Sequence, residues 1–374
     1  MKKTIYNYFF YEFIRYFIVI LFALLAVFWT VQAVNFLDLV TDDGHAFRIY
    51  LLYSLLTIPK IFTKLIPFAF LSASVLTILK LEKDNELVIL WTSGLNKIHV
   101  VNLIFRISLV IMLLQFIMAT FVTPKTLNFS RNLIKNSELQ FIPSLLKEKQ
   151  FNDTVEGLTI FVDKKNPGGT YENIFIRDDG KILTQISEGS STIFAKAGYI
   201  SNDEKNLILL NGNIQKNEEG GNVSIISFDK TSINLSGLST KSISEIKIQE
   251  TPTIQIIQCM QKDKPKSHNC SHAETESKDL KIEINKRLGM PLFIPLIALI
   301  TCFLLSGRKE KKFSGFQKYI FFAIGILVLV SSEITVRYSG LSFNHSAIYY
   351  IIPFALLPIV YLFLLRTFKY ENLN

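Results

Sequence analysis

Six long apolar runs constrain the fold of this chain more than any other feature. A helix that crosses a hydrocarbon core of about 30 Å needs about 20 largely apolar residues. Six stretches come close to that length: Phe13–Phe36, Leu51–Leu79, Ile98–Val122, Leu288–Leu305, Tyr319–Val336 and Ala347–Leu365. The first is longer than a signal-peptide core of about 7–15 residues, so we interpret it as a retained helix. The sequence therefore predicts an α-helical membrane protein with three spans before a long polar segment and three after it.

Composition and charge agree with a membrane location. Only 19% of the residues are charged, against about 25% in soluble domains. Lys and Arg gather in short loops on one side of the predicted spans, whereas the first loop on the other side is acidic. The basic residues are Lys2, Lys3, Arg308, Lys309, Lys311, Lys312, Lys318, Arg366 and Lys369, and the acidic ones are Asp38, Asp42 and Asp43. Both termini are thus predicted to be cytoplasmic and residues 123–285 periplasmic. The net charge of +9 is then largely a topology signal, and nucleic acid is not expected as a partner.

The polar segment has the pattern of a β domain. Short runs of β-favouring residues alternate with Gly-rich or Asn-rich turn signals. The runs are Leu158–Val162, Asn173–Ile176, Thr192–Ala195, Leu207–Leu210 and Val223–Phe228, and the turn signals are at 166–169, 178–180, 211–213 and 219–222. We predict an antiparallel sandwich or jelly roll, with helical connectors near 125–149 and 271–287 and a loop over Lys262–Lys278. Phe161, Phe175 and Phe194 are candidate wall positions of its interior.

Cysteine and histidine residues give weaker signals. Cys259 and Cys270 lie close together in the predicted periplasmic segment, where a disulfide can form, whereas Cys302 lies in an apolar run and reads as a buried small side chain. The group His268, Cys270 and His272 lacks a second ligand pair, so we predict no metal site. No phosphate-binding loop, HExxH or GxSxG motif occurs in the sequence, and the chain is predicted not to be an enzyme.

The link between the second and third spans carries the most informative short pattern. Over residues 82–94, Leu87, Leu90 and Trp91 fall on one face of a helix, which Asp84 can cap at the start and Gly94 can end. One interpretation is an interfacial linker, which periodicity alone favours. The other is a coupling helix that docks into a cytoplasmic ATPase, with Glu86 pairing to a basic residue there.

Several segments resemble the lipopolysaccharide export permeases LptF and LptG, and LptF more closely. The resemblance lies in Leu65–Phe70, Asn85–Leu95, Glu156–Val162, Leu210–Gln215 and Asn285–Leu292. Family members typically have Glu-Ser-Glu where this chain has Lys83-Asp84-Asn85-Glu86. The resemblance therefore implies an ATPase contact for Glu86, with Leu87, Leu90, Trp91 and Gly94 forming the coupling helix, but not for the first glutamate of that motif.

The resemblance implies a subunit of a transporter in the inner membrane of a Gram-negative bacterium. Such an ABC permease extracts lipopolysaccharide from the membrane with the help of a second, LptG-like permease. A dimeric LptB-like ATPase uses ATP and Mg, a single-span LptC-like protein associates at a gate formed by spans one and five, and an LptA-like bridge receives the lipid. The chain itself needs no cofactor. Residues 1–122 and 286–374 would form the membrane part, with the coupling helix at 82–94, and 123–285 the periplasmic domain.

Ionisable residues inside the predicted spans offer a substrate contact. Lys60 and Lys64 are one helical turn apart, as are Glu333 and Arg337. One interpretation makes Lys60, Lys64 and Arg337 contacts for the phosphates of lipopolysaccharide. The other makes them snorkelling lysines and an intrahelical Glu–Arg pair, and the sequence favours neither.

Two other classes of protein remain as alternatives. A mechanotransmitting ABC permease of the macrolide-exporter kind also lacks ATPase motifs, but its outer domain follows the first of four spans. A membrane-bound enzyme of envelope lipids needs polar catalytic residues at one depth, and the sequence shows no such set.

Overall fold

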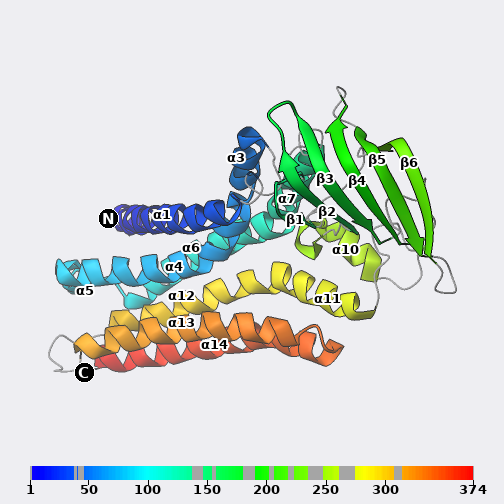
Figure 1. Ribbon diagram of the computed structural model, residues 1–374. Coiled ribbons are helices and arrows are strands. Elements are labelled where there is room, and N and C mark those ends of the chain that lie inside the picture. Colours follow the sequence, from blue (N-terminus) through cyan, green and yellow to red (C-terminus); the bar gives the residue numbers. More distant parts are fainter. Residues whose placement is uncertain are drawn as a thin grey trace. The chain divides into compact units, whose positions relative to one another are not determined.

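The chain forms two compact units in the computed structural model (Figure 1). The described residues are 2–37, 40, 46–136, 146–153, 157–179, 190–201, 206–217, 223–234, 247–260, 274–306 and 314–373. The first unit comprises Met1–Thr30, Thr57–Leu127 and Ile248–Asn374, and the second comprises Val31–Leu56 and Asn128–Lys247. The predicted domain limits at 123 and 285 are limits of membrane spans, which such a division by contacts does not test.

Helices make up the first unit. They are α1 (Lys2–Asn35), α4 (Ile58–Lys83), α5 (Glu86–Thr92), α6 (Lys97–Ile117), η1 (Met118–Val122), η3 (Ile248–Glu250), α10 (Thr253–Met260), α11 (Glu274–Gly289), η4 (Met290–Leu292), α12 (Phe293–Cys302), η5 (Phe303–Ser306), α13 (Ser314–Tyr338) and α14 (Phe343–Leu373). Within the described chain, six helical stretches are long and apolar enough to cross a membrane: Ile5–Asn35, Phe47–Lys83, Lys97–Ile134, Lys278–Ser306, Lys318–Tyr338 and Phe343–Lys369. The predicted arrangement of three spans, a β domain and three spans is confirmed.

Burial divides these helices into central and peripheral ones. Every residue of α12 is buried, and α12 lies beside α4, α6, α13 and α14. The most apolar part of the span that contains α12 is 78% buried, whereas those of α1, α13 and α14 are each only 17% buried. The peripheral helices therefore present most of their apolar side chains to the outside of this unit.

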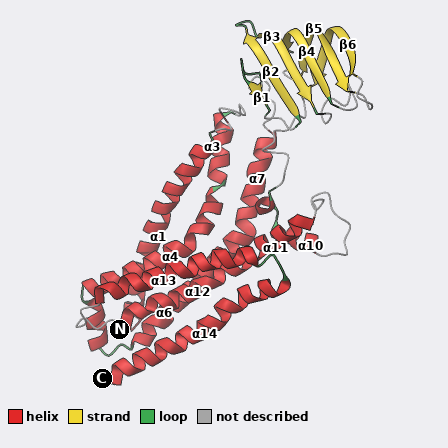
Figure 2. Ribbon diagram, turned by 60° about the horizontal axis from the view of Figure 1, so that its bottom comes forward, coloured by secondary structure: helices red, strands yellow, loops and turns green. Residues whose placement is uncertain are grey.

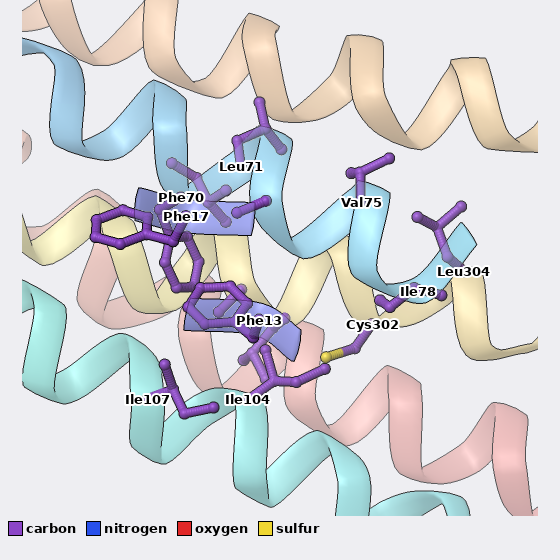
Figure 3. Packing of buried hydrophobic residues seen from close by; sticks show 14 of the residues in the cluster. Phe13, Phe17, Phe70, Leu71, Val75, Ile78, Ile104, Ile107, Cys302 and Leu304 are labelled. Carbon is purple, nitrogen blue, oxygen red and sulfur yellow. The ribbon is translucent and has the colours of Figure 1, made fainter. Parts of the chain in front are cut away.

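Close packing joins α1 to the central helices. On α1 the buried residues recur at every fourth position, which places them on one side of the helix: Phe9, Phe13, Phe17, Leu21 and Leu25. Figure 3 shows Phe13 and Phe17 beside Phe70 of α4, and the ring centroids of Phe13 and Phe70 are 5.5 Å apart. The predicted buried thiol, Cys302, lies in the same cluster and is fully buried.

The second unit contains an antiparallel β sheet. Its strands are β1 (Phe151–Asn152), β2 (Leu158–Lys165), β3 (Thr170–Asp178), β4 (Ser191–Ile200), β5 (Asn206–Asn217) and β6 (Val223–Asn234), which pair in chain order (Figure 2). Short connections that return the chain antiparallel produce this up-and-down order. The predicted antiparallel domain is confirmed, but among the described strands there is neither a second sheet nor the crossed connection of a jelly roll.

A small helical cluster belongs to the same unit. It includes α3 (Phe47–Leu56) and the end of α7 (Thr123–Asn136). Ile134 of α7 packs against Phe36, Ile49 and Tyr53, and the Tyr50 hydroxyl donates a hydrogen bond of 3.0 Å to the Ala33 carbonyl.

The two faces of the sheet differ in burial. Alternate residues of each strand form the buried cluster, with Ile160, Ile176 and Ile193 as neighbours across β2, β3 and β4. Phe161, Phe175 and Phe194 point to the opposite face because side chains alternate along a strand. There the ring of Phe175 makes edge contacts with Phe194 and with Phe151 of β1, which also contacts Phe161, and Phe194 is exposed. The hypothesis that these phenylalanines line the interior is therefore wrong for the described sheet.

The predicted turn at 211–213 is also wrong. Asn211, Gly212 and Asn213 lie within β5, and Asn211 adopts a left-handed conformation with φ of 53°. A Cβ atom on Gly212 would lie 2.2 Å from the Phe194 carbonyl oxygen and 2.5 Å from the Phe228 ring. The Asn-Gly pair, which is typical of turns, here allows a local distortion and a close approach of β4 to β5.

We predict that Gly212→Ala destabilises the protein by about 1–3 kcal/mol, because the new methyl group would overlap a backbone atom of β4. The measurement is the thermal unfolding of the purified protein in detergent. Gly168→Ala is the matched control, since a Cβ atom at Gly168 meets nothing within 4 Å. Equal melting temperatures for the two variants would contradict the assignment.

Candidate functional site

The short helix α5 is the first candidate site, and it is anchored to the bundle along one face. Leu87 is buried, and Leu90 and Trp91 pack against the main apolar cluster of the first unit. The predicted apolar face is therefore present. On the other side, Val88 and Ile89 are 45% and 63% exposed, which leaves two large apolar side chains without cover in this chain.

The ends of α5 differ in part from the prediction. Asp84 does not cap the helix: it ends α4, and its backbone N–H donates to the Lys80 carbonyl at 2.9 Å. Asn85 lies at the N-cap instead, with φ of 59° and no side-chain cap. Asp84 and Asn85 alone join the two helices, and Asp84 lies at the C-cap of α4 rather than at the start of α5.

Gly94 ends α5 as predicted. Its φ is +81°, and its N–H donates to the Trp91 carbonyl at 3.1 Å, while the Leu95 N–H donates to the Leu90 carbonyl at 3.2 Å. This pair of bonds is a Schellman motif, in which glycine tolerates the left-handed conformation best. It turns the chain directly from α5 into α6.

Glu86 and its surroundings form a charged cluster. The Tyr8 hydroxyl donates to Glu86 Oε1 at 3.0 Å. Nearby on the same helices, Lys80 Nζ is 2.8 Å from Glu12 Oε1, and Lys318 Nζ of α13 is 3.0 Å from Glu82 Oε2. Polar contacts thus connect α1 and α13 to the end of α4 and to α5. Tyr8 was missed by sequence reasoning, because its partner lies 78 residues away.

A basic cleft in the first unit is the second candidate site. It has a volume of about 70 Å³ and is lined by residues of α4, α6, η1, α7, η3, α11 and η4. Its charged lining residues are Lys60, Lys64, Glu283, Lys286 and Arg287. The structure thus brings Lys60 and Lys64 together with two further cations of α11, which sequence reasoning did not single out.

Arg287 is buried in the wall of this cleft, and the nitrogen atoms of its guanidinium all donate hydrogen bonds. It is only 4% exposed. Its Nε donates to Glu283 at 2.8 Å, one terminal nitrogen donates to the Thr251 carbonyl and to Thr253 Oγ1 at 2.9 Å each, and the other donates to the carbonyls of Ile248 and Gln249. These bonds fasten η3 and the start of α10 to α11.

The polar contacts continue from Arg287 across the cleft. The Thr253 hydroxyl donates to the Thr120 carbonyl at 2.7 Å, and Thr120 lies in η1, a π-helical turn. Gln115 Nε2 donates to the Thr63 carbonyl of α4 at 3.2 Å. A π-helical turn shifts the backbone bonding of a helix and often occurs at functional sites. Here the Thr120 carbonyl of this turn accepts the hydrogen bond from Thr253.

Lys286 and Glu333 form an ion pair between α11 and α13. The Lys286 Nζ and Glu333 Oε1 atoms are 2.6 Å apart. The alternative that Glu333 pairs with Arg337 on its own helix is therefore wrong, because α11 supplies a closer cation. Arg337 is exposed and is not among the residues that line the cleft.

The predictions for Cys259, Cys270 and the histidines beside Cys270 stay untested. Cys270, His268 and His272 lie outside the described residues, so the pairing of Cys259 with Cys270 stays a prediction. Within the described residues there is no group of three or more His, Cys, Asp or Glu side chains that could hold a metal ion.

Comparison with known proteins identifies the family. The model of the family "Lipopolysaccharide export system permease LptF/LptG" matches residues 7–367, which is nearly the whole chain. The chain belongs to the LptF/LptG family. Lipopolysaccharide export permeases of this family are multi-pass proteins of the inner membrane of Gram-negative bacteria. The family model includes LptF and LptG alike, so the closer likeness to LptF stays a prediction.

A curated relative also spans most of the chain. An uncharacterized protein of Rickettsia prowazekii (strain Madrid E) is 26% identical over 324 residues, which cover 84% of this chain and 85% of the relative. The shared length extends the likeness across both groups of spans and the β domain.

We predict that Arg287→Ala lowers the stability of this LptF/LptG protein by about 3–5 kcal/mol, because it leaves Glu283 without its cation in a buried site and removes the bonds to η3. Thermal unfolding in detergent measures the effect. Arg337→Ala removes an exposed arginine as the control. A similar melting temperature for both variants would show that the Arg287 contacts contribute little.

Proposed function

We propose that this chain is one transmembrane subunit of an ABC transporter that extracts lipopolysaccharide from the inner membrane and passes it to a periplasmic bridge. A second related permease, a dimeric cytoplasmic ATPase, a single-span LptC-like protein and an LptA-like bridge would complete the system. The observation that carries the proposal is α5, which is anchored on one face and bare on the other, within a chain that matches this family nearly end to end.

The two faces of α5 suit a coupling role. Its buried face fixes the helix to α4 and α6, so a displacement of α5 would move the bundle. Val88 and Ile89 are exposed and Glu86 beside them is half-buried. A cytoplasmic ATPase with a basic, apolar groove would fit this apolar and acidic surface. An interfacial linker would explain the exposed apolar residues, but not the acidic residue that is held beside them by Tyr8.

The cleft suits the phosphorylated end of the lipid. Lys60, Lys64 and Lys286 bring three ammonium groups to one small site, and phosphate oxygens accept hydrogen bonds from such groups. Gln115 also lines the cleft, and its Oε1 atom is buried without a donor among the described residues. An N–H or O–H of an amino-sugar headgroup would satisfy it. The exposed apolar sides of α1 and α13 would lie against acyl chains or a second permease.

We predict that Glu86→Ala abolishes or strongly weakens association with the ATPase, because α5 would lose its one acidic contact. Co-purification of the tagged permease with the ATPase and the ATPase rate of the complex are the measurements. Asp84→Ala is the control, since Asp84 is an exposed acid two residues away. Tyr8→Phe removes the partner of Glu86 but keeps the carboxylate, so it should preserve association. Full association of the Glu86 variant would refute the coupling role.

We predict that a photocrosslinking residue at position 60 or 64 captures lipopolysaccharide in cells, and does so more efficiently than one at position 337. The first two positions line the cleft, and Arg337 does not. Immunoblotting for lipopolysaccharide on the purified permease measures capture. Capture at 337 alone, with folded protein at all three positions, would refute the role of the cleft.

A further inference from the structure

Lys286 belongs to the cleft and to the attachment of α13 at the same time. It lines the cleft together with Lys60 and Lys64, and its Nζ atom lies 2.6 Å from Glu333 Oε1. Glu333 does not line the cleft. Lys286 therefore lines the space that a ligand would enter, while its ammonium group pairs with a carboxylate of a neighbouring helix.

Arg287 cannot exchange partners in the same way. A guanidinium has five N–H donors in a fixed geometry, and those of Arg287 are engaged by Glu283, Thr253 and three backbone carbonyls. An ammonium group has three donors on a flexible stem. Lys286, which is half-buried, is therefore the cation of α11 that can turn to a new anion.

Ion pairs and apolar packing together attach α13 to its neighbours. It packs against α12, α4 and α14, and Val336 near its end is buried beside Phe293 and Leu296 of α12. Near its start Lys318 pairs with Glu82 of α4, and near its end Glu333 pairs with Lys286 of α11. Between these points Gly325 allows α13 to approach α4 closely, since a Cβ atom there would lie 2.5 Å from Leu71 Cδ1. The most apolar part of α13 is only 17% buried, and the Lys286–Glu333 pair is one of several attachments near its end.

We propose that Glu333 is the resting counter-ion of Lys286, and that a phosphate group in the cleft displaces it and thereby removes one of the contacts that attach α13 to α11. The inference rests on the proposed function, in which a phosphorylated lipid enters the cleft. A phosphate monoester carries a charge of about −1.5 to −2 at neutral pH, against −1 for a carboxylate, and it gains Lys60 and Lys64 as additional partners. Phosphate is therefore the stronger partner for Lys286 once it is bound.

The exchange links the cleft to the movement of α13. By thermodynamic linkage, the factor by which the Glu333 contact weakens phosphate binding equals the factor by which phosphate weakens that contact. The pair is partly exposed, so its loss should change affinity by about two- to fivefold. Occupation of the cleft would then affect α13, whose other end pairs with Glu82 of α4.

The test uses the full chain in lipid nanodiscs with purified lipid A as the probe, in a bisphosphorylated and a dephosphorylated form. Affinity is measured by titration, and the distance between α11 and α13 by spin labels at Asp279→Cys and Ile334→Cys in a background without native cysteines. In the chain that keeps Lys286 and Glu333, bisphosphorylated lipid A should lengthen this distance and the dephosphorylated form should not.

Variants separate an exchange from a structural role. Glu333→Gln should bind bisphosphorylated lipid A about two- to fivefold more tightly, and Lys286→Ala should bind it more weakly. Glu82→Gln removes the other ion pair of α13 with the same change in charge, and it should leave affinity unchanged. The double exchange Lys286→Glu with Glu333→Lys restores the ion pair but places a carboxylate in the cleft, so α13 should stay attached whether or not lipid A is present.

Each outcome decides between the proposals. If the wild-type chain binds neither form of lipid A, the cleft does not hold the lipid, and the proposed function of the cleft fails together with this inference. If the wild type binds the bisphosphorylated form but Glu333→Gln binds it no better, or both forms move α13 equally, the exchange is refuted and the binding role of the cleft stands.

Discussion

A buried guanidinium imposes the strictest condition on the helical unit. Arg287 is surrounded by apolar helices, and an arginine in such a place is costly unless acceptors satisfy all its N–H groups. Most carbonyls of a helix already accept one bond within the helix, which makes them less available as acceptors. The chain provides them from an irregular segment, where the carbonyls of Ile248, Gln249 and Thr251 are free to accept. The position of η3 and α10 therefore follows from the need to surround Arg287.

The same condition explains the π-helical turn beside the cleft. Thr253 accepts one hydrogen bond from Arg287 and donates another to Thr120. Thr120 lies within the π-helical turn η1, a local departure from α-helical bonding. One buried cation thus determines the local geometry of three segments that are far apart in the sequence. It also makes the wall of the cleft rigid on the α11 side.

Sequence patterns predicted what depends on local periodicity. The spans follow from the length of apolar runs, and the anchored face of α5 follows from the helical spacing of Leu87, Leu90 and Trp91. Contacts between residues far apart in sequence carry no such signal. Arg287 donates a hydrogen bond to Thr253, 34 residues away. Glu333 pairs with Lys286, 47 residues away, and not with Arg337 one turn along its own helix. Asn211 and Gly212 were misread because a turn-forming dipeptide can equally permit a distortion inside a strand. Packing between strands decided between the two.

Two adjacent residues of α11, Lys286 and Arg287, make contacts of different kinds at the cleft. Arg287 is saturated by short bonds to its own unit and cannot move without leaving Glu283 unpaired, whereas Lys286 makes one ion pair to a peripheral helix. The central helix α12 is buried over its whole surface, whereas the peripheral helix α13 packs along one side and also joins α4 and α11 through the ion pairs Lys318–Glu82 and Lys286–Glu333. An ion pair can be exchanged for another at little cost, but a packed core cannot be opened without creating a cavity. A transporter that must move one wall of its binding site and keep the other fixed requires this difference, and α11 has both kinds of contact on consecutive residues.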